Sequence, residues 1–120
     1  MKPKINYKLS DFCFNHNLKT RWRDLDAFQH INNATILSYM EDARVALFER
    51  WGVNYKENGV IVAGIKIDYI KQIEHPSKLE VGSRISRLGT KSYDLESVIF
   101  LKNTKEPLAL MTCYIVCFDF

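Results

Sequence analysis

The sequence lacks the features that mark several classes of protein. No apolar stretch approaches the roughly 20 residues needed to cross a membrane as a helix, and none follows the two early lysines, so we expect no signal peptide. The net charge of +3 is too small to indicate a nucleic-acid partner. The three cysteines lack CxxC or Cys/His metal spacing, which favours reduced, buried thiols in a cytoplasmic protein.

The sequence also has no internal repeat, no low-complexity tract and no linker. Its 120 residues are enough for one compact domain. With 47% hydrophobic and 26% charged residues, the composition is typical of a soluble globular protein. We therefore expect a single domain over residues 1–120.

A long amphipathic helix is predicted after a polar loop at residues 24–33. Its apolar positions recur at steps of three and four residues: Ile36, Met40, Ala43, Leu47 and Trp51. Asn32 or Asn33 can cap the helix by accepting a hydrogen bond from an unpaired backbone N–H, and Gly52 can end it in the left-handed conformation. Such a helix has about five turns, which is long for so small a domain.

The rest of the chain has the alternation of strands. Strands are predicted over residues 12–22, 60–73, 79–88, 93–102 and 108–120. In the first of them, the side chains expected on the buried face are Phe12, Phe14, Leu18 and Trp22. The later loops are short, which favours antiparallel neighbours. These elements predict an α+β fold in which about five strands wrap around one helix, and the uncovered face of the sheet indicates dimerisation.

The polar loop and the start of the helix carry a motif. The pattern D-x-x-x-H-[IV]-N-N is formed here by Asp26, His30, Ile31, Asn32 and Asn33, and the helix continues with YMEDAR at residues 39–44. This pattern resembles the 4-hydroxybenzoyl-CoA thioesterase-like branch of the hotdog-fold thioesterases. The later stretches IKIDYIKQI and LEVGSRISRLGTKSYDLE are similar to the same family, so the resemblance covers about residues 10–120.

The resemblance implies a hotdog fold and an enzyme of fatty acid metabolism that hydrolyses acyl-CoA or acyl-carrier-protein thioesters without a metal or cofactor. Two positions depart from the branch. Gln29 stands where many acyl-CoA thioesterases of this branch have glycine. The run Gln-His-[IV]-Asn-Asn resembles instead the plant acyl-carrier-protein thioesterases. Phe28 stands where those plant enzymes have asparagine. The choice between coenzyme A and acyl-carrier protein therefore stays open.

The motif residues suit thioester hydrolysis. Asp26 can act as a nucleophile or as a general base for water, and the helix N-terminus can stabilise the oxyanion that develops on the carbonyl. His30 can orient Asp26, bind the carbonyl or protonate the thiolate, while Asn32 and Asn33 can cap the helix and hold a water. The alternatives are a capping role for the aspartate and a different catalytic acid, Asp24 or Glu41.

The carrier needs a cationic surface, because coenzyme A and the phosphopantetheine arm are anionic. Candidate residues surround one hairpin turn: Arg84, Arg87, Lys91 and Ser92. A solvated basic edge that prevents aggregation is the competing interpretation. The acyl tail is expected in an apolar slot between helix and sheet. The resemblance implies a homodimer or homotetramer with sites at the subunit interface, and the rival hypotheses are a non-catalytic hotdog module that binds acyl carriers and, more weakly, a hotdog dehydratase.

Overall fold

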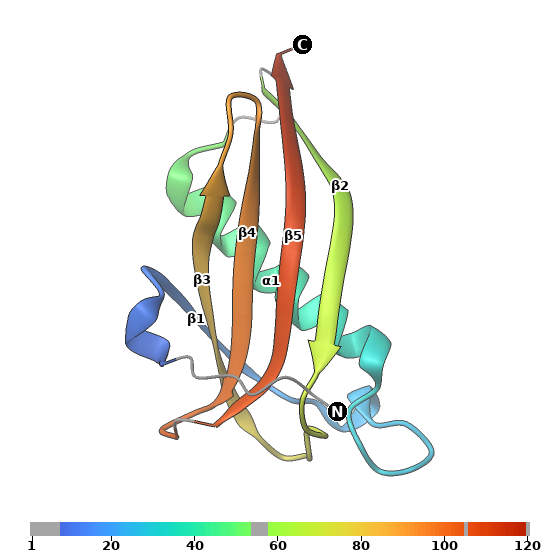
Figure 1. Cartoon of the computed structure of the whole chain (residues 1–120). Helices are drawn as coiled ribbons and strands as arrows, with labels where there is room; N and C mark the ends of the chain where they lie inside the picture. The colour runs from blue at the N-terminus through green and yellow to red at the C-terminus, as the bar shows by residue number, and fades with distance from the viewer. Residues whose placement is uncertain (1–7, 54–57, 105, 120) are drawn as a thin grey trace.

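One long helix lies across a five-stranded antiparallel sheet (Figure 1). The computed structural model describes residues 8–53, 58–104 and 106–119. The helix α1 spans Asn33–Trp51, and the strands are β1 (Phe14–Lys19), β2 (Asn58–Tyr69), β3 (Lys78–Leu88), β4 (Ser92–Leu101) and β5 (Pro107–Asp119). The strand order is β1-β3-β4-β5-β2, so β1 and β2 form the two edges. This is the predicted hotdog arrangement.

The main core lies between α1 and one face of the sheet. Met40, Ala43 and Leu47 of α1 are fully or almost fully buried, as the three- and four-residue spacing predicts. They belong to one cluster with Leu95 and Ile99 of β4, the strand at the centre of the sheet. The exposed face of α1 carries Glu41, Asp42, Glu49 and Arg50, together with Val45 and Trp51, which are 43% and 44% exposed. Among the described residues, no helix has the length and apolar character needed to span a membrane.

Both ends of α1 are capped as the sequence predicts. Asn32 is the N-cap, and its Oδ1 accepts a hydrogen bond from the N–H of Ala34 at 2.8 Å. Gly52 adopts the left-handed conformation with φ of 70°, and its N–H donates to the carbonyl of Glu49 at 3.1 Å. These caps fix where the helix begins, and the N-terminal end is the one beside the predicted catalytic loop.

A smaller apolar cluster covers the opposite face of the sheet. Phe12 packs there on Phe100 and Val98, with ring centroids of the two phenylalanines 6.1 Å apart. Gly82 makes this possible, since a Cβ at that position would lie 2.8 Å from Cγ of Phe12. The prediction that Phe12 and Trp22 share a buried face is therefore wrong: Phe12 is buried on the face opposite to α1, and Trp22 is 77% exposed.

Two predicted strands are shorter in the structure. The first ends at Lys19, because the chain turns into the short 3-10 helix η2 (Trp22–Asp24). The second ends at Tyr69, after which the N–H groups of Ile70 and Lys71 both donate to the carbonyl of Leu108. This double contact ends regular pairing with β5, so residues 70–73 leave the sheet.

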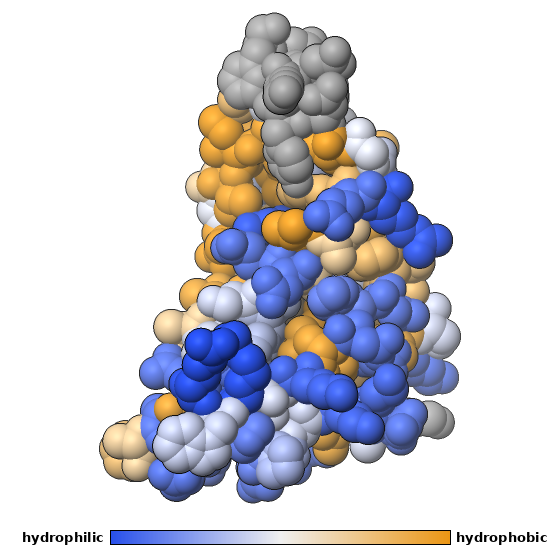
Figure 2. Space-filling model, turned by 180° about the vertical axis from the view of Figure 1, so that it is seen from behind, coloured by the Kyte–Doolittle hydropathy of each residue, from blue (hydrophilic) through white to orange (hydrophobic). Residues whose placement is uncertain are grey.

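Strand β2 is an edge with apolar side chains. It is 12 residues long, and among the described strands it pairs with β5 alone. Its residues Ile61 and Ile65 are 51% and 47% exposed, and Figure 2 shows apolar side chains along the upper part of this edge. A long, apolar and unpaired edge is a surface on which another strand can pair.

All three cysteines are free thiols. Burial raises the pKa of the Cys113 thiol, although Arg44 beside it opposes that shift. Cys117 is partly buried and Cys13 is exposed. The expectation of reduced thiols stays a prediction, and the expectation that all of them are buried is wrong for Cys13.

Candidate active site

The loop between η2 and α1 is built around the carboxylate of Asp26. Its Oδ1 accepts hydrogen bonds from the N–H groups of Phe28 at 2.8 Å and His30 at 3.3 Å. The main chain closes the same turn, because the N–H of Asp26 donates to the carbonyl of His30 at 2.8 Å. No described residue donates a hydrogen bond to Oδ2. One oxygen of Asp26 therefore holds the turn, and the other is available for chemistry.

Gln29 adopts a backbone conformation that favours glycine. Its φ is 64°, in the left-handed region, which most L-residues adopt at a cost of roughly 1–2 kcal/mol. The N–H of Gln29 donates to the carbonyl of Asp26 at 3.1 Å, which keeps the turn closed. Phe28 stands at its tip and is 81% exposed.

The motif residues surround a hollow of about 390 Å³ at the N-terminus of α1. This hollow, which we call the Asp26 hollow, is lined by Asp26, His30, Ile31, Asn32, Asn33, Ile36, Tyr69, Lys71 and Gln72. The structure thus brings together the four predicted residues of the loop and helix start. Because the hollow lies at a helix N-terminus, backbone N–H groups and the positive end of the helix dipole face it.

His30 places a ring nitrogen in a buried position. Its Nδ1 is the one buried side-chain nitrogen or oxygen in the described part of the chain that has no hydrogen-bond partner. Buried polar atoms normally have a partner, so an unpaired nitrogen beside an open hollow marks a place where a ligand or water can bind. This observation agrees with a site role for His30 but does not distinguish the three roles expected from the sequence.

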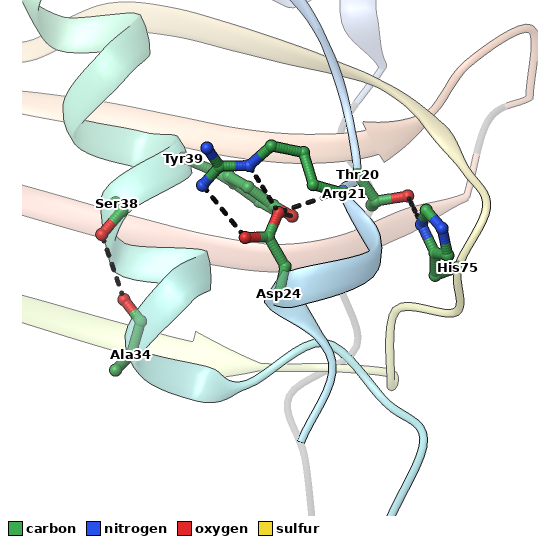
Figure 3. Close-up of polar contacts among 7 residues, drawn as sticks. All are labelled: Thr20, Arg21, Asp24, Ala34, Ser38, Tyr39 and His75. Atoms are coloured by element: carbon green, nitrogen blue, oxygen red, sulfur yellow. Dashed lines mark hydrogen bonds and ion pairs between the residues drawn. The ribbon is translucent and has the colours of Figure 1, made fainter. Parts of the chain in front are cut away.

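Asp24 is a structural residue in this arrangement. It is 4% exposed, and its carboxylate accepts hydrogen bonds from the Tyr39 hydroxyl at 2.5 Å and from the Arg21 guanidinium at 3.0 Å (Figure 3). Burial alone would raise the pKa of Asp24, but the hydrogen bonds from Arg21 and Tyr39 outweigh it, and the pKa is lowered. Burial and the contact with Asp24 raise the pKa of Tyr39.

This cluster ties three elements together. Arg21 follows β1, Tyr39 lies one and a half turns inside α1, and the carbonyl of Asp24 accepts the N–H of the N-cap residue Asn32 at 3.0 Å. Because Asp24 is enclosed by these partners and does not line the Asp26 hollow, it is not placed to react with a substrate there. Glu41 is 66% exposed, pairs with Arg44 and is also outside the hollow.

The predicted carrier residues lie at the other end of the molecule. Arg84 pairs with Glu96 at 2.8 Å, and Arg87 pairs with Asp94 at 3.0 Å. Lys91 and Ser92 are in the β3–β4 hairpin, which Figure 1 places at the end of the sheet opposite to the start of α1. Within one chain these residues do not approach Asp26, and their role as carrier ligands stays a prediction.

Three residues of the hollow were missed by the sequence analysis. Tyr69 ends β2, and its hydroxyl donates to the carbonyl of Asn33 at 3.1 Å, which joins the sheet edge to the helix start. Lys71 and Gln72 follow it, and Lys71 pairs with Glu106. The sequence analysis placed all three residues in one strand over residues 60–73. In the structure that strand ends at Tyr69, and residues 70–73 leave the sheet beside the helix start.

Comparison with known proteins identifies the family of the chain. The sequence model of the thioesterase-like superfamily matches residues 20–120. The chain belongs to this superfamily. The long-chain acyl-CoA thioesterase FadM of Escherichia coli is 30% identical over 107 residues, which are 85% of this chain and 80% of FadM. The predicted family is confirmed.

A further sequence relative and a solved structure are also similar to this chain. The YsmA protein of Bacillus subtilis is 28% identical over 95 residues, which are 78% of this chain and 64% of YsmA, so the match spans slightly less than two thirds of that relative. The PA2801 protein of Pseudomonas aeruginosa is 29% identical in sequence and superposes with a TM-score of 0.83, over 88% of this chain and 84% of that protein. The predicted fold is confirmed.

Proposed function

We propose that this member of the superfamily hydrolyses acyl thioesters, releasing a carboxylic acid and a thiol from acyl-CoA or acyl-carrier protein. The observation that carries the proposal is the state of the Asp26 carboxylate. One oxygen is fixed by two backbone N–H groups and the other is free, within a hollow at a helix N-terminus. The fixed carboxylate supplies the attacking group or general base, and the backbone donors supply the stabilisation of the oxyanion that thioester hydrolysis needs.

Asp26 acts in one of two ways. As a nucleophile, its free oxygen attacks the thioester carbonyl, the C–S bond breaks, and water then hydrolyses the mixed anhydride. As a general base, it takes a proton from a water that attacks the same carbon. In both routes, N–H groups at the start of α1 stabilise the negative charge on the carbonyl oxygen. His30 lines the same hollow and can orient Asp26, bind the carbonyl or protonate the departing thiolate.

We also propose that the active form is a homodimer or a dimer of dimers. Strand β2 is a long unpaired edge with exposed isoleucines, and Tyr69 at its end lines the Asp26 hollow. A second copy that pairs along β2 would therefore border the hollow and contribute to the site. A solution mass equal to the 14.0 kDa of one chain would exclude this arrangement.

The test is a thiol-release assay with a panel of acyl-CoAs on wild type, Asp26→Asn and Asp26→Ala. Asparagine keeps the Oδ1 acceptor that holds the turn, so Asp26→Asn isolates the loss of the carboxylate. We expect both variants to lose about 10²–10⁴ in kcat, the range for a positioned acid or base. The matched control is Asp42→Asn, which removes an exposed acid on α1 and should keep the wild-type rate.

Two outcomes would contradict the proposal. Wild-type rates in a folded Asp26→Asn variant would show that Asp26 is not catalytic. No turnover of any thioester by wild type would favour the alternative function, a non-catalytic module that binds acyl-CoA or acyl-carrier protein in the same hollow.

A further inference from the structure

Three lysines surround a separate hollow at the end of the sheet. Lys19 of β1, Lys78 of β3 and Lys102 after β4 line a space of about 110 Å³, here called the lysine hollow. Lys19 and Lys78 are direct partners across the two strands, and the N–H of Lys102 donates to the carbonyl of Lys78 at 2.9 Å. The neighbouring pair Leu18 and Leu79 faces the core, so alternation directs the lysines to the face away from α1.

The charges in the lysine hollow are not neutralised by the described part of the chain. None of the three lysines forms an ion pair within 4.0 Å there. Glu80 lies two residues along β3 from Lys78 and therefore on the same face. It forms no ion pair with a described residue either. Like charges directly opposite each other on neighbouring strands destabilise a sheet. An arrangement that is unfavourable in the free protein is favourable when an anion binds between the charges.

The lysine hollow is connected to the candidate active site. The Asp26 hollow shares Lys71 and Gln72 with a second hollow. That hollow shares Ser77 with a third hollow. The third hollow shares Lys19 and Lys78 with the lysine hollow. The start of β3, the β4–β5 turn and the loop before α1 all lie at one end of the molecule (Figure 1). Neighbouring hollows in this series share lining residues from Asp26 to the three lysines, and we call the series the groove.

We propose that Lys19, Lys78 and Lys102 bind the phosphate groups of coenzyme A while its thioester reaches Asp26 along this groove. The inference rests on the proposed function, and it deepens it by assigning the carrier site. The groove places a reactive carboxylate at one end and unpaired cations at the other, which matches a carrier with a thioester at one end and phosphates at the other. In the β3–β4 hairpin, by contrast, Arg84 and Arg87 already have acidic partners.

A kinetic experiment compares two substrates that carry the same acyl group. Acyl-CoA has the phosphates, and acyl-pantetheine lacks them. In Lys78→Met and in the double variant Lys19→Met/Lys78→Met, we expect KM for acyl-CoA to rise about tenfold or more, the loss of one charge-assisted contact, with kcat unchanged. Both constants for acyl-pantetheine should stay at the wild-type values. Lys8→Met, which removes an exposed lysine near the N-terminus and outside the groove, is the matched control.

Three kinetic results would overturn the proposal. KM for acyl-CoA could be unchanged in the lysine variants, which would show that they do not contact the carrier. KM could rise equally for both substrates, which would show an effect other than phosphate binding. Or KM for acyl-CoA could rise in Lys91→Met and not in Lys78→Met, which would place the phosphates at the β3–β4 hairpin.

Binding without turnover separates this inference from the proposed function. Free coenzyme A should raise the melting temperature of wild type and of Lys8→Met, and should raise it much less in Lys78→Met and in Lys19→Met/Lys78→Met. Pantetheine should have no such difference between proteins. If wild type hydrolysed no thioester but showed this pattern, the function would fail and the phosphate site would stand. If hydrolysis persisted and coenzyme A stabilised all variants equally, the phosphate site would be refuted alone.

Discussion

Removing the hydroxyl of Tyr39 tests how the catalytic loop is held. In Tyr39→Phe, the buried carboxylate of Asp24 loses its 2.5 Å hydrogen bond but keeps the contacts from Arg21. The carboxylate is therefore not left without partners, so the penalty is that of one hydrogen bond to a charged group. We expect the free energy of unfolding to fall by about 1.5–3 kcal/mol at pH 7.

The penalty should depend on pH. The pKa of Asp24 is lowered in the folded protein, so its ionised form stabilises the fold above the unfolded pKa of about 3.9, and this contribution is lost as the pH falls through the folded pKa. Below that pKa the contact with Tyr39 joins two neutral groups, worth about 0.5–1.5 kcal/mol. The difference between wild type and Tyr39→Phe should therefore shrink in acid.

Urea denaturation at pH 7 and at a pH below the folded pKa of Asp24, which lies under 3.8, measures both values, provided that the slope with urea stays constant. Tyr114→Phe is the matched control, since Tyr114 is partly exposed on the sheet and should lose less than 0.5 kcal/mol, the limit for most surface changes. A penalty for Tyr39→Phe below this limit, or an equal penalty at both pH values, would refute the assigned role of the contact.

Three further substitutions test the ends of α1 and the second cluster, each by urea denaturation. Asn32→Ala should cost about 1 kcal/mol because the cap of Ala34 is lost, and Asn32→Asp should restore it. Gly52→Ala should cost roughly 1–2 kcal/mol from its φ of 70° alone, since no atom lies within 4 Å of the added Cβ. Gly82→Ala should be destabilising through its contact with Phe12, and the penalty should shrink in a Phe12→Leu background, whereas strict additivity would contradict that contact.

Most of the fold could be predicted because its signals are local. The spacing of apolar residues located α1, and Asn32 and Gly52 marked its ends, since each side chain acts on the backbone within a few residues. The antiparallel strands followed from short loops. Local signals also placed Asp26 and His30 together, because both belong to one turn that leads into the helix.

The errors concern contacts between distant segments. Phe12 and Trp22 have the parity of the buried face, but β1 spans only Phe14–Lys19, so Phe12 precedes the strand and Trp22 follows it. The packing on Phe100 decides where Phe12 lies. Tyr69 and Lys71 reach the site because β2 ends beside the helix start, which the alternation in their own segment does not reveal. Asp24 reads as a second reactive acid until its contact with Tyr39, 15 residues away, is known.

The unequal roles of the two oxygens of Asp26 have an evolutionary consequence. The oxygen that builds the turn needs only to accept hydrogen bonds, and an amide oxygen does this as well as a carboxylate. Under the proposed mechanism, a single exchange of aspartate for asparagine would therefore remove the reaction and leave the loop, the helix start and the hollow intact. In such a scaffold, an enzyme and a protein that merely carries its ligand are separated by one nucleotide change rather than by a change of fold.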